Sequence, residues 1–260
     1  MMKVGLLDFT ESLRRLPLSF YFAWGDTKAR YRRSVLGPFW LVLGTTIGVA
    51  GLGFLWSALL KIDRASFIPS LTIGLVVWQL IAGCVIESPS VFTRNATVIR
   101  NLKTPYLIFP VQLLLRQLIN FGHNLIVVLV VLVIFPPPLS LVQFLIAPGL
   151  LLLIGNLLWV AVMLGMLGAR FRDLEPLIAA FMPMMFFLSP VIYRPNQLAI
   201  HEQIVWLNPF SYMISLIRDP MQGFAPPNFV YLVSFGMLVI GWCVALWLLN
   251  RRHGRIAFWV

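Results

Sequence analysis

Long apolar runs without charged side chains limit most strongly what this chain can fold into. The first runs from Pro38 to Leu60 and holds no Asp, Glu, Lys, Arg or His. As an α-helix its 23 residues would reach roughly 34 Å, enough to cross the ~30 Å hydrocarbon core of a bilayer. Over all 260 residues, 60% are hydrophobic and 11% are charged, which is far from the composition of a soluble domain. The sequence therefore predicts an all-α polytopic membrane protein.

Six membrane-spanning helices are expected, and they make up a single transmembrane domain over residues 38–249. Their approximate bounds are 38–60, 68–86, 117–135, 141–169, 176–191 and 229–249. The third is placed after Arg116, because Pro110 and Arg116 interrupt its apolar run, and Arg116 would extend back to the headgroups. His123 in the same span is either a functional ionisable group or a neutral packing residue.

Three segments outside these spans have their own patterns. Residues 1–37 carry apolar side chains at spacings of three and four, which predicts an amphipathic helix at the membrane interface, broken near Pro17. Residues 94–106 predict a short amphipathic helix on the same side of the membrane. The apolar pieces in 191–227 are each too short to cross, so we expect re-entrant or interfacial helices between the fifth and sixth spans. Residues 250–260 are expected to form a cytoplasmic tail.

The basic residues give the orientation. Of the 20 Lys and Arg, 16 fall in the two terminal segments, residues 88–116 and the turn at 170–175. That turn carries Arg170, Arg172, Asp173 and Glu175. Such a bias predicts that this side, with both termini, is cytoplasmic. The net charge of +11 is thus explained by lipid headgroups and cytoplasmic loops, and no nucleic-acid partner is expected.

The sequence offers no pattern typical of a catalytic site. It has no phosphate-binding G-x-x-x-x-G-K-[ST] motif, no H-E-x-x-H motif and no carboxylate pair or metal-ligand cluster that could share a site. Cys84 and Cys243 lie in apolar runs and are expected to be small buried side chains without a disulfide. We therefore expect that the chain is not an enzyme and that it binds no metal or cofactor. The energy for any transport must then come from a partner protein.

Three stretches together resemble a known family over essentially the whole chain. They are RYRRSVLGPFW at 30–40, RFRDLEPL at 170–177, and SPVIY at 189–193 followed by LNPFSY at 207–212. This set resembles the permease subunit of ABC-2 type polysaccharide exporters, in particular the O-antigen exporters of Gram-negative bacteria, with capsule and teichoic acid exporters as relatives. The resemblance implies a homodimer in the inner membrane, two copies of a separate ATP-binding protein that holds ATP and Mg²⁺, and a polyprenyl diphosphate-linked polysaccharide as substrate.

Two other functions stay open at this stage. One is an ABC-2 permease for a small amphiphile or a lipo-oligosaccharide, which the partner ATPase and neighbouring genes would distinguish. The other is a membrane scaffold or sensor that does not transport, in which case no ATPase should co-purify.

Candidate site residues follow from chemistry and from the resemblance. Arg30, Arg32 and Arg33 could bind the diphosphate of a lipid carrier. The alternative is that they only set the orientation of the chain in the membrane and attract anionic lipid. Aromatic rings suit a sliding glycan chain, although each could equally be a lipid anchor or a packing residue. The candidates for the channel lining are Trp40, Phe54, Phe186, Phe187 and Tyr193. The candidates for ATPase coupling are Val98, Ile99, Arg100, Leu102 and Lys103.

The charge distribution makes a direct prediction of topology. Reporter fusions after Leu60, Pro138 and Gly223 should report the outer side, and a fusion at Val260 should report the cytoplasm, because the basic segments resist translocation. Paired alkaline phosphatase and green fluorescent protein fusions would measure this. An external signal at Val260 would contradict the six-span arrangement.

Overall fold

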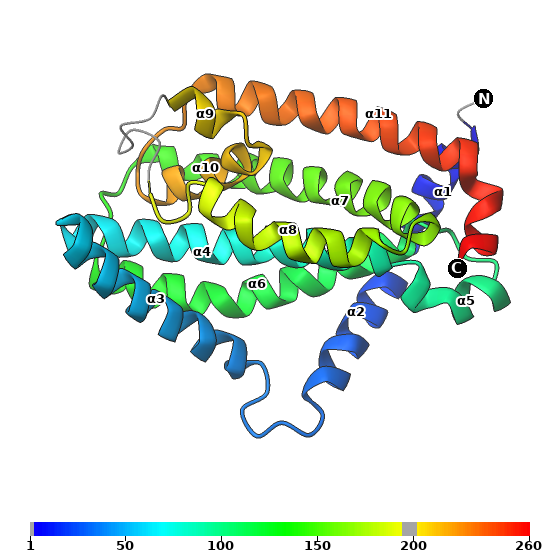
Figure 1. Ribbon diagram of the computed structural model, residues 1–260, viewed down its shortest axis with the longest axis horizontal. Helices are drawn as coiled ribbons and strands as arrows, with labels where there is room; N and C mark the ends of the chain where they lie inside the picture. Colours follow the sequence, from blue (N-terminus) through cyan, green and yellow to red (C-terminus); the bar gives the residue numbers. More distant parts are fainter. Residues whose placement is uncertain (1–2, 194–201) are drawn as a thin grey trace.

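The protein is a bundle of long α-helices that lie nearly side by side (Figure 1). The structure, a computed structural model, describes residues 3–193 and 202–260. Every regular element in these residues is helical, so the predicted all-α class is confirmed. Five helices are long and apolar enough to cross a membrane. They are α3 (Phe39–Leu60), α4 (Arg64–Glu87), α6 (Ile108–Ile134), α7 (Ile146–Arg170) and α11 (Asn228–Trp259).

Both chain termini lie at one end of the bundle, at the right of Figure 1. We call this the terminal end. It also holds α1 (Lys3–Arg14), α5 (Ala96–Asn101) and the turn between α7 and α8 (Leu174–Leu188). The opposite, distal end holds the α3–α4 turn and α9 (Glu202–Trp206). The bounds of the short 3₁₀ turns are η1 (Ser88–Ser90), η2 (Thr93–Asn95) and η3 (Leu141–Leu145).

The fifth apolar segment forms a shorter helix than expected. Helix α8 has 15 residues, which corresponds to only about 22 Å and falls short of the bilayer core. It ends because Ser189 adopts an extended backbone, with φ −90° and ψ 146°, before Pro190. Helix α10 (Pro209–Met221) lies at the distal end and packs against α4, α7 and α11. The described residues thus hold five helices of spanning length and one shorter apolar helix, and the count of six crossings stays a prediction.

Two expected boundaries differ from the observed helices. Helix α6 begins at Ile108, well before residue 117, because Pro110 sits in its first turn, where a missing N–H costs little. At the other end of the chain, α11 continues to Trp259 through the segment 250–260 that was expected to be a tail. The C-terminal turns pack inward, since Ile256 and Val260 are buried.

The N-terminal segment forms two helices with the break that Pro17 predicts. Helix α1 ends at Arg14, and Pro17 lies in the first turn of α2 (Leu16–Tyr31). Helix α2 packs against α6 through small side chains spaced four apart, namely Ser19, Ala23 and Thr27. After α2 the chain turns away at the lowest point of Figure 1 and enters α3. Gly37 makes that turn possible with a φ of +53°.

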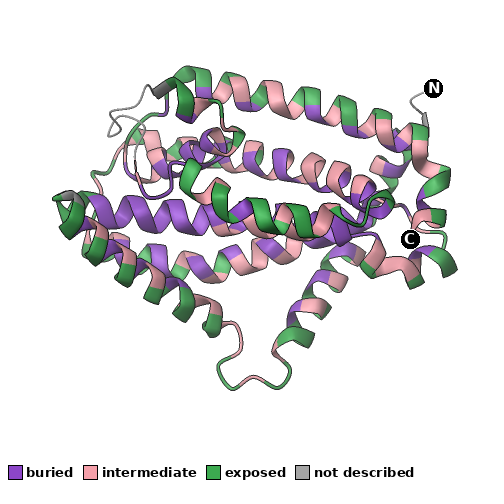
Figure 2. Cartoon of the chain, viewed as in Figure 1, coloured by how far each residue is buried: buried purple, intermediate pink, exposed green. Residues whose placement is uncertain are grey.

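Helix α4 is the centre of the bundle. It is buried over most of its length, whereas α3 is largely exposed (Figure 2). Within the apolar windows of the two helices, 83% of the α4 residues are buried but only 17% of the α3 residues. Helix α4 packs against α3, α6, α8 and α10. Helix α3 is therefore the least buried of the spanning helices, and its apolar surface is available to lipid or to another subunit.

A separate hydrophobic core lies at the terminal end. It joins the α4–α5 connection, α5 and the end of α11, and it includes Phe92, Ile99 and Ile256. The buried carboxylate of Asp8 on α1 accepts backbone N–H bonds from Tyr106 at 2.9 Å and Leu107 at 3.0 Å. These contacts fix the N-terminal helix and the approach to α6 in one unit.

Close helix contacts depend on glycines in α7. A Cβ added at Gly168 would overlap the backbone of Pro89, and one added at Gly149 would overlap the carbonyl of Leu216. These two positions let α7 approach η1 and α10. Both cysteines are free, and only Cys84 is buried, because Cys243 lies on an exposed face of α11.

Candidate functional site

Two adjoining cavities form a polar cleft beside α4 and α6. The first, of about 330 Å³, lies between the end of α2, the end of α4 and the start of α6. The second, of about 360 Å³, lies between α3, α4 and α6. Arg30 and Glu87 line both cavities, so the two cavities adjoin at these side chains. The cleft leads from the terminal end into the apolar part of the bundle.

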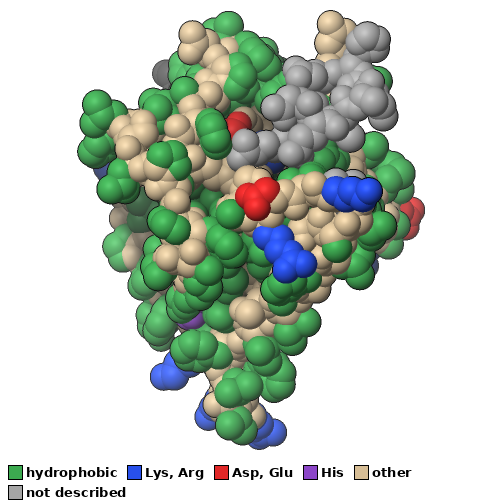
Figure 3. All heavy atoms as spheres, turned by 90° about the vertical axis from the view of Figure 1, so that its left-hand side faces the viewer, with side chains coloured by type: hydrophobic (Ala, Val, Ile, Leu, Met, Phe, Trp, Pro, Cys, Tyr) green, Lys and Arg blue, Asp and Glu red, His purple; other side chains and the backbone are tan. Residues whose placement is uncertain are grey.

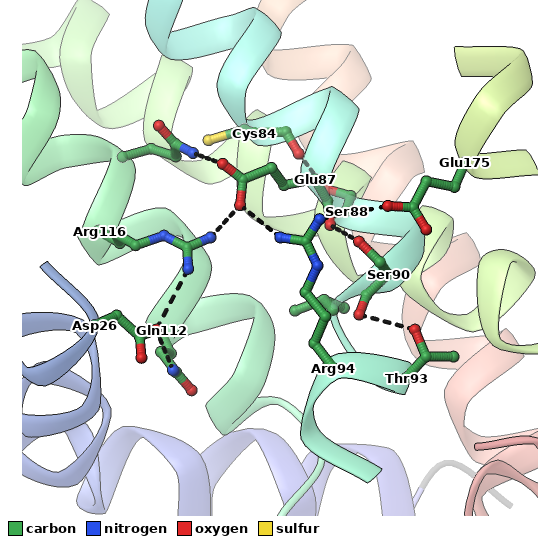
Figure 4. A network of polar contacts seen from close by, with 12 residues as sticks. Asp26, Cys84, Glu87, Ser88, Ser90, Thr93, Arg94, Gln112, Arg116 and Glu175 are labelled. Carbon is green, nitrogen blue, oxygen red and sulfur yellow. Dashed lines mark hydrogen bonds and ion pairs between the residues drawn. The ribbon is translucent and has the colours of Figure 1, made fainter. Parts of the chain in front are cut away.

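The first cavity is built around a network of charged side chains (Figure 4). Glu87 at the end of α4 forms an ion pair with Arg116 of α6 and another, at 3.1 Å, with Arg94. Arg116 also reaches Asp26 of α2 at 3.3 Å, and Arg94 reaches Glu175 of α8 at 3.3 Å. Four helices and the η2 turn therefore meet through five charged side chains.

Arg116 is the least exposed member of this network. Its side chain is 14% exposed and that of Glu87 is 20% exposed, so Arg116 does not extend to the headgroups as expected from the sequence. The physical reason is that carboxylates from α2 and α4 neutralise it inside the protein, which removes the need to reach water. His123 is also satisfied locally, because its Nδ1 lies 2.7 Å from the carbonyl oxygen of Ile119.

Two buried polar atoms of the first cavity have no partner within the described residues. The Gln112 side-chain amide donates to Asp26 at 2.8 Å, but its oxygen accepts no hydrogen bond. Nε of Arg116 likewise donates to nothing. Both atoms are enclosed by the surrounding protein, so neither is open to a ligand in the cavity.

Apart from Arg30 and Glu87, the polar side chains that line the second cavity are uncharged. Thr45 of α3 donates to Asn124 of α6 at 3.0 Å, and Asn124 donates to Gln79 of α4 at 2.8 Å. Nearer the terminal end, Gln117 donates to Glu87 at 2.8 Å and accepts from Asn120 at 3.2 Å. Amides and hydroxyls at this depth are costly unless they are paired, and here they pair with one another across three helices.

This arrangement suits a neutral, hydroxyl-rich ligand. Asn and Gln amides offer both donors and acceptors, as sugar hydroxyls do, and they carry no charge that would hold such a ligand tightly. The charged network with Arg30 lies at the end of the cleft formed by α2, α4 and α6, which we call the charged end. An anionic group at one end and a polar, uncharged chain along the rest would match the lining.

The distal end of the bundle is closed by α10 and by a buried arginine. Arg218 is 1% exposed and donates to the carbonyl oxygens of Pro190 and Tyr193, the latter at 3.3 Å. It also pairs with Asp219 at 3.1 Å. Figure 3 shows the molecule from this end, with few charged side chains and with apolar side chains on its flanks. Basic side chains gather at the lowest point of that view, where the α2–α3 connection lies.

Comparison with known proteins agrees with this architecture. Residues 19–222 match the model of the ABC-2 type transporter family. The chain belongs to the ABC-2 type transporter family. Similar proteins include two named O-antigen export system permease protein RfbA from Klebsiella pneumoniae, with 26% and 23% identity over 242 residues. These alignments cover 89% of this chain and 90% of the relatives. A Myxococcus xanthus protein of the same name is 24% identical over 199 residues, 75% of each chain.

The arginines expected to bind a head group are separated in this ABC-2 permease. Arg30, on the last turn of α2, lines both cavities of the cleft. Arg32 and Arg33 follow on the exposed α2–α3 connection and line neither cavity. Only Arg30 of the three is therefore in position to act on a ligand in the cleft.

The aromatic candidates also fall in different places. Trp40 lines the second cavity of the cleft. Phe187 and Tyr193 line an apolar cavity of about 520 Å³ at the distal end. Phe186 packs against Trp78 of the core, with ring centroids 5.8 Å apart. Phe54 is exposed on α3, with the guanidinium of Arg64 5.2 Å from its ring centroid, and lines none of these cavities.

The structure places the candidate coupling residues on two faces. Helix α5 ends at Asn101, and Leu102 is extended, so the helix is shorter than the predicted 94–106. Ile99 is buried against the permease's own core and Val98 is half-buried. The remaining candidates are exposed, namely Arg100, Leu102 and Lys103. Arg100 also donates to the carbonyl oxygen of the C-terminal Val260.

Of the charged residues in the α7–α8 turn, only some belong to the site. Glu175 joins the charged network through Arg94. Asp173 precedes α8 without capping it through its side chain, and Arg172 is exposed. Arg170 stacks on aromatic rings outside the cleft.

Sequence reasoning missed most of the residues that line the cleft. The sequence does contain a signal for them, which is the spacing of residues within the spans. On α4, Gln79, Gly83 and Glu87 lie four residues apart. Gln117, Asn120 and Asn124 recur at three and four on α6. Polar residues at this period lie on one helix face, so two such faces predict a polar seam between two spanning helices.

The pairing of Glu87 with Arg116 should be measurable in a double-mutant cycle. The Glu87→Gln and Arg116→Gln variants, alone and combined, should give a coupling energy of about 2 kcal/mol in unfolding, because removal of one partner leaves a partly buried charge. Denaturant titration in detergent would measure it. The exposed pair Glu11 and Arg15 is the control and should couple by less than about 0.5 kcal/mol. Equal coupling in both cycles would contradict this role.

Proposed function

We propose that this permease is the membrane subunit of an ATP-driven exporter that moves a lipid-linked polysaccharide, of the O-antigen kind, from the cytoplasm across the bacterial inner membrane. The observation that carries the proposal is the polar cleft, with charged residues at one end and neutral amides beyond them. The relatives named as O-antigen export permeases support the same substrate class. Under this proposal the terminal end faces the cytoplasm, in agreement with the clustering of basic residues there.

The diphosphate of the lipid carrier would enter at the charged end of the cleft. Arg30 supplies a guanidinium that both cavities share, and Trp40 lies in the second cavity, where the first sugars would follow. Guanidinium groups bind phosphate oxygens bidentately, which an ammonium group cannot do.

The transport path would be completed by a second copy of the chain. Helix α3 is the least buried of the spanning helices, and a Cβ added at Gly44, Gly48 or Gly51 would meet no other atom within 4 Å. Small residues on one face of a spanning helix permit close helix contact. Helix α8 also exposes large apolar side chains, including Phe181, Met184 and Phe187. We therefore propose a homodimer, with ATP and Mg²⁺ held by two copies of a separate ATP-binding protein.

Coupling to that ATPase would use the exposed side of the α5–α6 connection. This connection lines a groove of about 500 Å³ together with α1, and Leu102 and Lys103 face it. Leu102 is 57% exposed, a large apolar side chain free for a partner. The buried Ile99 would instead support the groove from below.

Replacement of Arg30 by Lys should test the head-group site. The Arg30→Lys variant keeps the charge but loses bidentate binding, and surface polysaccharide should fall about tenfold at an unchanged membrane level of the protein. Immunoblots of surface polysaccharide would measure export. The Arg32→Lys/Arg33→Lys variant is the matched control and should export normally. Wild-type export from Arg30→Lys would remove the head-group role.

A pair of charge changes should separate coupling from folding. The Leu102→Asp/Lys103→Glu variant should insert normally but lose co-purification of the ATPase, since both side chains are exposed in the groove. The Val98→Asp/Ile99→Asp variant should instead lower the membrane level of the permease, because it places a carboxylate in the core. The control Leu139→Asp/Lys61→Glu makes the same changes at the distal end. Unchanged complex yield from Leu102→Asp/Lys103→Glu would contradict the docking site.

A further inference from the structure

A cluster of arginines at the terminal end lies outside the cleft and has no counterion within the described part of the chain. Arg251, Arg252 and Arg255 lie on the last turns of α11, and Arg170 ends α7. Arg252 is within electrostatic range of the other three. Across residues 3–193 and 202–260, none of the four is in an ion pair. We call these four residues the α7–α11 arginine cluster.

The carboxylates of the terminal end are engaged elsewhere. Asp8 accepts two backbone N–H bonds and faces Nε2 of His253 at 3.1 Å. Glu87 and Glu175 are held by Arg94 and, for Glu87, also by Arg116. Like charges four residues apart on a helix repel, as Arg251 and Arg255 must. An anion from outside the chain would relieve that repulsion.

Aromatic rings surround the cluster. The guanidinium of Arg251 lies 5.4 Å from the ring centroid of Trp247, and that of Arg170 lies 5.0 Å from Phe171 and 5.8 Å from Trp259. A guanidinium on a ring face loses conformational freedom but keeps its N–H donors available. Trp247 and Phe171 are more than half exposed, which leaves apolar surface beside the charges.

The position of the cluster along α11 matches the headgroup region. The helix has 32 residues and is about 48 Å long, so it exceeds the ~30 Å bilayer core by several turns. Trp247 and the arginines after it fall in the excess at the terminal end. Trp at the boundary, followed by basic residues, is the arrangement expected at an interface between lipid and water.

We propose that the α7–α11 arginine cluster binds the phosphate of an anionic phospholipid, with the acyl chains against Trp247 and Phe171. The exposed rings decide between a lipid and an acidic protein surface, because they supply an apolar contact next to the charge that acyl chains fill. The site is separate from the cleft and is independent of the exported substrate.

The experiment uses the full-length protein, purified without the ATPase and equilibrated with equal amounts of phosphatidylglycerol and phosphatidylcholine. Native mass spectrometry counts the retained lipid. Wild type should retain phosphatidylglycerol preferentially, and the Arg251→Gln/Arg255→Gln variant should reduce that retention about tenfold. The matched control, Lys61→Gln/Arg64→Gln, removes two cations at the distal end, including an arginine over Phe54, and should behave as wild type.

Three results would overturn the proposal. They are unchanged retention by Arg251→Gln/Arg255→Gln, an equal loss in the control, and full displacement of the lipid by excess inorganic phosphate, which would assign the site to free phosphate. If the Gln variant does not fold, the Arg251→Lys/Arg255→Lys variant should retain intermediate amounts, and full retention would contradict bidentate binding. Loss of ATPase co-purification with lipid retention intact would assign the surface to the ATPase instead.

Discussion

The ion pair between Glu87 and Arg116 is the contact on which the arrangement of the cleft depends. A carboxylate or a guanidinium at the start of a membrane helix is costly unless a partner neutralises it within the protein. Here each charge has two partners, so the ends of α2, α4, α6 and α8 must come together around them. The cleft exists because these four helices converge at the charges while α3 diverges from α2.

The helices are unequally buried, so one part of the bundle is tightly packed and another part has few neighbours. Helix α4 contacts neighbours on almost every side, and α7 is brought against η1 and α10 at positions where only glycine fits. Helix α3 is held mainly by its contacts with α4 and α6, and the hydrogen bonds of Thr45 are polar links in that contact. A helix held in this way can shift at little cost in buried apolar area. In the proposed exporter, such a shift of α3 would widen the cleft.

Much of the fold could be predicted because the membrane imposes simple rules on a single chain. Apolar length predicted five helices of spanning length, and Pro17 predicted where the N-terminal segment breaks. The differences arose where a local rule was overridden by a distant partner. The third span was expected to begin after Arg116, but carboxylates from α2 and α4 neutralise Arg116 inside α6. For the 250–260 segment, the sequence predicted neither the continuation of α11 nor the burial of Ile256 in a core from other helices.

The candidate site shows the same division. By itself the sequence determined that the chain is helical and membrane-embedded, and that its motifs resemble ABC-2 polysaccharide export permeases. Only the tertiary structure decided that Arg30 lines the cleft while Arg32 and Arg33 do not, that Ile99 faces inward, and that Gln79 meets Asn124. The physical reason is that hydropathy and charge act on each segment separately. Hydrogen bonds and ion pairs between helices depend on how the segments rotate against one another, and that rotation is set only when they pack.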